Sequence, residues 1–138
     1  MPAGDGKSYL FLTTKAAPDT ALMLPGTLRV AYSTKGIADE VYCNGSMPFP
    51  SGVETHVAVV IDRTAKSMAL YQDGALLRDC ALTRPLSAID DVNNWLGHSN
   101  YAADVDLSGI FNEFRIYGAA LSAAQIEDSF VAGPDATH

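Results

Sequence analysis

The sequence has few basic residues and no long hydrophobic run, and each shortage excludes a class of partner. Nine lysine and arginine side chains stand against sixteen aspartates and glutamates, which gives a net charge of −7. Binding to nucleic acid or to an anionic membrane depends on clustered cations, so we expect neither partner. The longest unbroken apolar run, Val57–Ile61, is far shorter than the roughly 20 residues of a membrane-spanning helix. No basic segment followed by an apolar stretch opens the sequence, so we expect no signal peptide.

Cysteine and histidine are also scarce. The two cysteines belong to no C-x-x-C motif, and the three histidines stand far apart at positions 56, 98 and 138. A structural zinc site therefore has too few ligands. We expect Cys43 and Cys80 to be two buried free thiols, and a disulfide between them is the alternative if the domain is exported.

What the sequence does contain is a succession of short segments with the composition of strands. The length of 138 residues is that of one domain. Strands are expected at residues 8–13, 27–33, 39–43, 56–62, 67–72, 75–82, 93–97 and 107–117. Asp73-Gly74 predicts a tight hairpin, because a type I′ turn needs positive φ at both central positions. Many short strands with regular turn signals predict an all-β antiparallel sandwich over residues 1–138.

One helix is expected near the end of the chain. Ser122 followed by Gln125 has the spacing of a capping box. Ile126 and Phe130 lie four residues apart and share a face, and Gly133-Pro134 ends the pattern. A helix this short is not stable alone, so its apolar stripe must dock on a sheet.

Several stretches of the sequence match, in their order and spacing, the pattern of a known protein family. They are His56–Asp62, Leu70–Gly74, Asn93–Ser99, Asn112–Tyr117 and Ala120–Ser122. These stretches resemble the laminin-G-like domains of the concanavalin A-like lectin/glucanase superfamily. The resemblance implies a jelly-roll β-sandwich, and an extracellular location if the chain is part of a longer protein.

The sequence departs from that family pattern in three places. Family members usually carry further strands before the segment that corresponds to residues 9–13 here. Glu54 stands where the family often has tryptophan, and Asn112 stands where an acidic residue is common. A sandwich short of strands leaves unpaired edges and uncovered apolar faces. We therefore expect either a homo-oligomer, in which a second copy completes the sheets, or a smaller closed sandwich.

The resemblance also raises the question of catalysis. Glucanases of the superfamily need two carboxylates facing each other across a sugar-binding cleft. The four glutamates, at positions 40, 54, 113 and 127, lack the clustered spacing of those enzymes. Glu113 and Arg115 are expected to form an ion pair. We therefore expect no catalytic residues, with a remnant glycosidase as the less favoured alternative.

Two aromatic side chains have both a structural and a functional interpretation. His56 precedes an apolar strand, and packing or a backbone hydrogen bond is favoured over a ligand role. Trp95 could offer its ring to a sugar, but it lies within the family-matched strand and is expected in the core.

The segment from residue 98 to residue 106 is the candidate binding site. His98, Asn100, Tyr101, Asp104 and Asp106 supply a ring, an amide and carboxylates, which are the groups used in glycan recognition. In the alternative interpretation, Tyr101 and Asp104 pin the loop to the sandwich. The function expected is non-catalytic binding of a glycan or a protein surface through sandwich loops. The alternative is a structural module that acts through homo-oligomerisation.

Calcium is the cofactor that the resemblance raises, because many relatives bind it. Asp104 and Asn112 are the weak candidates for a structural ion, and Asp90-Asp91 is a further acidic pair. Calcium needs six to eight oxygen ligands, so a solvated acidic surface is the favoured interpretation.

Overall fold

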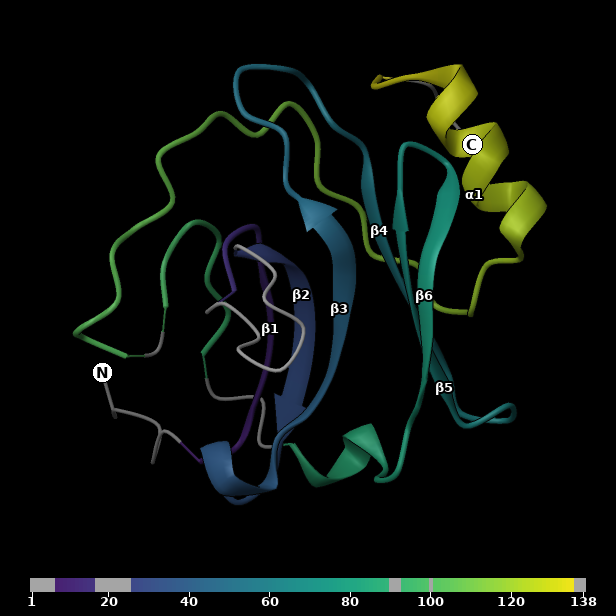
Figure 1. Ribbon diagram of the computed structural model, residues 1–138. Coiled ribbons are helices and arrows are strands. Elements are labelled where there is room, and N and C mark those ends of the chain that lie inside the picture. The colour runs from purple at the N-terminus through teal and green to yellow at the C-terminus, as the bar shows by residue number, and fades with distance from the viewer. Residues whose placement is uncertain (1–6, 17–25, 90–92, 100, 136–138) are drawn as a thin grey trace.

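Two antiparallel sheets and one helix make up the fold (Figure 1). The computed structural model describes residues 7–16, 26–89, 93–99 and 101–135. The first sheet contains β1 (Tyr9–Thr13), β2 (Thr27–Ser33) and β3 (Val41–Pro48), in that order. The second contains β4 (Val57–Asp62), β5 (Ser67–Gln72) and β6 (Ala75–Ala81), also in order. Short 3-10 turns lie at Ile37–Asp39 and Leu86–Ala88. The expected all-β sandwich with a late helix is confirmed.

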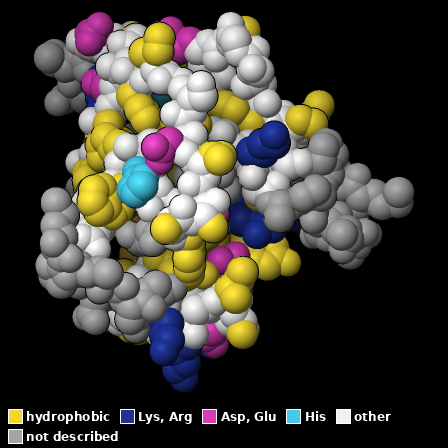
Figure 2. Space-filling model, turned by 90° about the vertical axis from the view of Figure 1, so that its left-hand side faces the viewer, with side chains coloured by type: hydrophobic (Ala, Val, Ile, Leu, Met, Phe, Trp, Pro, Cys, Tyr) yellow, Lys and Arg dark blue, Asp and Glu magenta, His cyan; other side chains and the backbone are white. Residues whose placement is uncertain are grey.

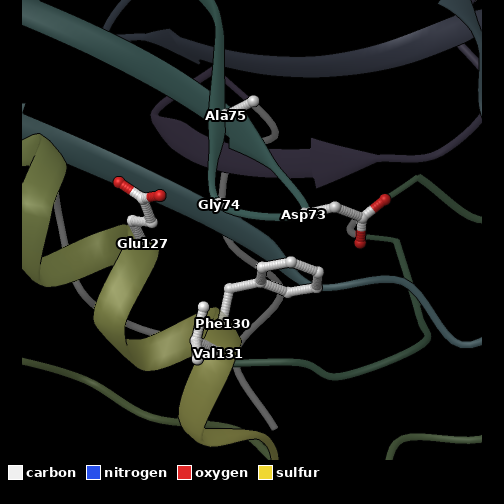
Figure 3. Close-up of a pocket in the computed structure, with 6 residues that line it drawn as sticks. All are labelled: Asp73, Gly74, Ala75, Glu127, Phe130 and Val131. Carbon is white, nitrogen blue, oxygen red and sulfur yellow. The ribbon is translucent and has the colours of Figure 1, made fainter.

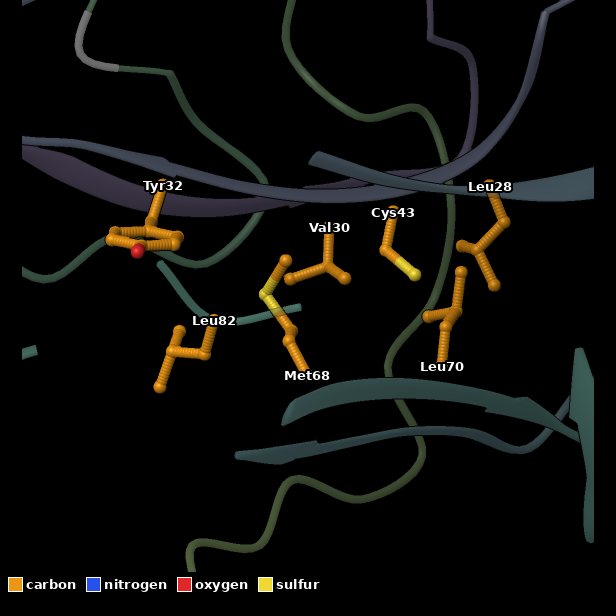
Figure 4. Packing of buried hydrophobic residues seen from close by; sticks show 7 residues of the cluster. All are labelled: Leu28, Val30, Tyr32, Cys43, Met68, Leu70 and Leu82. Carbon is orange, nitrogen blue, oxygen red and sulfur yellow. The ribbon is translucent and has the colours of Figure 1, made fainter. Parts of the chain in front are cut away.

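The core fills the space between the two sheets. Side chains alternate between the faces of a strand, so every second residue of β2 and β5 points inward. The fully enclosed cluster is formed by Leu28, Val30, Tyr32, Cys43, Met68, Leu70 and Leu82. Figure 4 shows these side chains reaching from both sheets toward one another. The Tyr32 hydroxyl also donates to the carbonyl of Arg84 at 3.0 Å and accepts from its amide at 2.6 Å. This ring therefore ties the connection after β6 to the first sheet.

A disulfide joins the sheets, and the expectation of two free thiols is wrong. Cys43 on β3 and Cys80 on β6 are bonded, with their Cα atoms 5.8 Å apart. Cys43 pairs across its sheet with the core residue Val30, and Cys80 pairs with the core residue Met68. Directly opposed residues share a face of the sheet, so both sulfurs point inward from opposite layers. Strand periodicity in the sequence does not reveal which strands face each other.

The hairpin between β5 and β6 has the expected geometry. Asp73 has φ 49° and Gly74 has φ 78°, so both central residues are left-handed as a type I′ turn requires. Gly74 is needed for a second reason, because a Cβ here would lie 3.1 Å from the Phe130 ring. The turn and the helix thus approach each other closely.

Helix α1 (Ala123–Ala132) covers the side of the second sheet that faces away from the first (Figure 1). Its capping box is confirmed, since Ser122 and Gln125 each accept from the other's backbone amide. Ile126 is buried against Ala69 and Tyr71. Among the described residues, no helix is both long and apolar enough to cross a membrane.

Two expected strands are not present. Residues 93–97 and 107–117 have irregular structure with bends and pair with no strand in the described part of the chain. Ile110 is 98% exposed and Ile116 is 84% exposed. Apolar alternation alone does not make a strand, because the backbone also needs a partner with free hydrogen-bonding groups. The expected strand at 39–43 instead starts at Val41, after a 3-10 turn, and continues to Pro48.

Candidate functional site on the 97–107 loop

The segment after the second sheet forms a loop that is closed at its base. The amide of Leu107 donates to the carbonyl of Gly97 at 2.8 Å. Inside the loop, the amide of Asp104 donates to the carbonyl of Tyr101 at 3.1 Å and forms a turn. The loop lies on the side of the first sheet that is farthest from α1 (Figure 1). Two backbone contacts therefore give this segment a defined shape without strand pairing.

An aromatic ring and an imidazole–carboxylate pair meet at this loop. The rings of Trp95 and His98 lie edge to face with centroids 5.3 Å apart. His98 Nδ1 lies 2.6 Å from Asp106 Oδ1. We call Trp95, His98 and Asp106 the loop site.

The expectation that Trp95 belongs to the core is wrong, because the residue is 45% exposed. Its segment is not a strand, so it has no inward face on which to place the indole. The His98 and Asp106 side chains are 49% and 73% exposed. All three groups of the loop site are thus accessible to a ligand.

Two of the other predicted site residues, Tyr101 and Asp104, make contacts that hold the loop in place. Ser99 Oγ donates to Asp104 Oδ2 at 2.6 Å and accepts from the amide of Tyr101 at 3.1 Å. The Tyr101 ring packs edge to face on Tyr9 of β1, with centroids 6.0 Å apart. These contacts support the interpretation that Tyr101 and Asp104 pin the loop. Asn100 lies outside the described residues.

Side chains on the outer face of the first sheet form a network that supports the contact between Tyr9 and Tyr101. The sequence pattern did not predict this network. Tyr9 donates to Glu40 Oε2 at 2.8 Å, and Arg29 lies 3.6 Å from the other oxygen of the carboxylate. Arg29 also donates to Asn44 at 2.7 Å and stacks over the Tyr42 ring at 4.5 Å. Burial, together with the neighbouring Glu40 carboxylate, raises the pKa of Tyr9 far above its usual value. Tyr9 therefore stays a neutral hydrogen-bond donor beneath the loop.

The two candidate calcium ligands lie in different settings. Asp104 is bonded to Ser99 within the loop, whereas Asn112 donates to Glu54 at 2.9 Å. Within the described ranges, no three acidic, histidine or cysteine side chains gather in a way that could hold a metal ion. Asp90-Asp91 lies outside the described residues.

The contact between Glu54 and Asn112 joins two of the positions at which the sequence departs from the laminin-G-like pattern. They lie 58 residues apart in the chain. An amide at position 112 can donate to a carboxylate, whereas an acidic residue there would repel it. The two departures are therefore chemically compatible with each other.

The four glutamates occupy four separate environments. Glu113 forms the expected ion pair with Arg115. Glu40 belongs to the network on the first sheet, Glu54 bonds Asn112, and Glu127 lies on the helix. Within the described residues, none of these contacts brings two glutamates together, whereas glycoside hydrolysis uses a pair of carboxylates.

A hollow of about 310 Å³ lies between the β5–β6 turn and α1. It is lined by Asp73, Gly74, Ala75, Glu127, Phe130 and Val131. Figure 3 shows the Asp73 and Glu127 carboxylates on opposite sides of the Phe130 ring, with the Asp73 carboxylate directed away from Glu127. Asp73 is also used structurally, because its Oδ1 accepts from the amide of His56 at 3.0 Å.

His56 has the structural environment that was favoured. Its carbonyl accepts from the amide of Asp73 at 2.8 Å, and its ring packs on Phe130 with centroids 5.9 Å apart. Burial lowers the pKa of His56, and Arg115 lowers it further, against the opposing effect of Asp73. The imidazole is therefore held toward its neutral form.

Comparison with known proteins settles the family. A family model described as the concanavalin A-like lectin/glucanases superfamily, under the name Laminin G 3, matches residues 3–127. The chain belongs to this superfamily. Among curated proteins, none matches. A solved structure of an S-layer domain-containing protein from Clostridium thermocellum is similar, with 23% identity and a TM-score of 0.49. The match covers 93% of this chain and 58% of that one.

Proposed function

We propose that this superfamily member is a non-catalytic binding module that takes a neutral carbohydrate at the loop site. The observation that supports it is the half-exposed Trp95 ring, held edge-on by His98 beside the Asp106 carboxylate. An indole face packs on the C–H face of a sugar ring, while imidazole and carboxylate groups bond its hydroxyls.

The charge of the chain narrows the ligand class. With a net charge of −7, the protein repels sulfated or uronic acid glycans at long range. The loop adds the carboxylates of Asp104 and Asp106 to the surface. A neutral oligosaccharide is therefore the favoured ligand.

The sequence offers a direct assay, because Trp95 is its one tryptophan. Binding at the loop site should shift the intrinsic fluorescence of the protein as neutral oligosaccharides from a glycan array are titrated. By calorimetry, Trp95→Ala should lose most of the affinity. Leu76→Ala is the control, since Leu76 is 54% exposed but lies on β6 of the second sheet. Unchanged affinity in Trp95→Ala, or no neutral sugar bound, would contradict the proposal.

Calcium is the cofactor to test in the same experiment, with Asp104 and Asn112 as its proposed ligands. Calorimetry with added calcium should give heat, and the melting temperature should rise, if these residues belong to an ion site. Without either effect, sugar binding at the loop site is independent of the ion.

An exported location is part of the proposal. The Cys43–Cys80 disulfide supports it, because such bonds persist in oxidising compartments.

A second candidate function is that of an assembly module whose partner is another copy of the chain. Several large apolar side chains between residues 105 and 117 are exposed, and this observation favours it. No response on the glycan array from a tight dimer would support this second function over the first.

A further inference from the structure

The inward face of the first sheet is not fully covered. Leu10 pairs across the sheet with Tyr32, and Leu12 pairs with Val30, so both leucines share the face of these core residues. Yet Leu10 is 46% exposed and Leu12 is 48% exposed. A leucine on the core-facing side of a sandwich strand is normally covered by the opposite sheet. Here β1 extends past the cover that the second sheet provides.

A second uncovered surface lies along the segment that follows the loop. Its exposed apolar side chains are Val105, Leu107, Ile110, Phe111, Phe114, Ile116 and Tyr117. The segment runs beside the first sheet and past the connection between β3 and β4 (Figure 1). Figure 2, which views that side of the molecule, shows apolar side chains spread over the visible face. We call residues 105–117 the apolar arm.

The area of these two surfaces is that of a stable interface. Large apolar side chains expose roughly 150–200 Å² each when fully accessible. With the fractions observed for Leu10, Leu12 and the apolar arm, about 1,000 Å² of side-chain surface is exposed per copy. A standard protein interface buries about 800 Å² on each partner.

We propose that the chain forms a two-fold dimer in which the apolar arm of each copy covers Leu10 and Leu12 of the other. This inference rests on the second function proposed above and specifies its interface. A second copy carries both the arm and the uncovered strand, so one rotation makes both contacts and closes the assembly. The free edge of β1, which pairs only with β2 among the described strands, also offers backbone groups to an incoming extended segment.

Charge is compatible with this packing. The apolar arm carries Glu113 and Arg115, which neutralise each other. Its remaining charge, Asp106, lies against His98. The two copies are therefore held together by burial of apolar surface, while the net charge of −7 on each copy opposes their association at long range. Added salt should tighten the dimer rather than loosen it.

Sedimentation velocity between 1 and 100 µM tests the proposal. We expect a dimer whose dissociation constant rises about tenfold or more in Ile110→Asp and in Ile116→Asp. These side chains are 98% and 84% exposed, so the substitutions leave the fold of a single copy unstrained. Ile37→Asp is the matched control, because Ile37 is 81% exposed on the turn before β3. A monomer at all concentrations would overturn the dimer.

Cross-linking separates this interface from any other. Mixing Leu12→Cys protein with Ile116→Cys protein under mild oxidation should give a heterodimer joined between these positions. A dimer that forms but cross-links only elsewhere, or that both aspartate variants leave intact, would refute the interface while the assembly function stands.

Discussion

The disulfide between the sheets should contribute a large part of the stability of this protein. Cys43 and Cys80 are separated by 37 positions. Closing a loop of that length removes enough chain entropy from the unfolded state to stabilise the fold by about 4 kcal/mol. The net stability of a domain is about 5–15 kcal/mol, so this one bond decides whether a weak sandwich stays folded.

Thermal unfolding followed by circular dichroism, with and without reductant, measures the effect. With an unfolding entropy of about 2.1 cal/mol/K per residue, the 138-residue chain should lose about 10–15 °C of melting temperature on reduction. The double variant Cys43→Ala/Cys80→Ala should melt near the reduced protein and show no further response to reductant. Mass spectrometry of the oxidised protein should find both thiols blocked to alkylation.

A loss of less than about 3 °C on full reduction would refute this reasoning, because it is far below what the loop entropy requires. Such a small loss would mean that residual packing in the unfolded state already keeps β3 and β6 close together without the disulfide. Free thiols in the oxidised protein would contradict the bond itself.

Three further changes test local features by thermal or urea unfolding. Gly74→Ala should destabilise by about 1–3 kcal/mol, because φ is 78° and the added Cβ lies 3.1 Å from Phe130. Gly52→Ala, with φ 76° and nothing within 4 Å, should cost less; equal losses would mean that the helix yields to the new methyl group. Ser122→Ala should cost about 1 kcal/mol by removing the cap of α1, and an unchanged midpoint would show that sheet packing alone holds the helix. Because the pKa of His56 is lowered in the folded protein, this residue should contribute to the free energy of unfolding above about pH 6.5, and the contribution should be lost as the pH falls below that value. His56→Gln should make the free energy of unfolding depend less on pH in this range. Parallel pH profiles of stability for the variant and the wild type would contradict the assignment.

Local sequence rules predicted the parts of the fold that depend on neighbouring residues. The Asp73-Gly74 turn and the capping box of Ser122 follow from backbone preferences within four residues, and both are confirmed. The six paired strands were likewise recognised, although β3 begins later than expected.

The errors concern features that depend on what lies opposite in space. The pairing of Cys43 with Cys80 requires that β3 and β6 face each other, which no local pattern reveals. Trp95 was expected inside because it lies within the family-matched strand signature, yet that segment has no described strand partner. His98 and Asp106 were proposed as binding residues from their types alone, but their mutual contact was not anticipated.

The backbone hydrogen bond from the amide of Leu107 to the carbonyl of Gly97 brings the two ends of the 98–106 loop together. Because its two ends meet, the sequence between them can be exchanged or lengthened while the sheets keep their register. Related proteins that share this scaffold can therefore differ at these nine positions without disturbing the sheets. An engineer could graft a foreign recognition peptide at the same place.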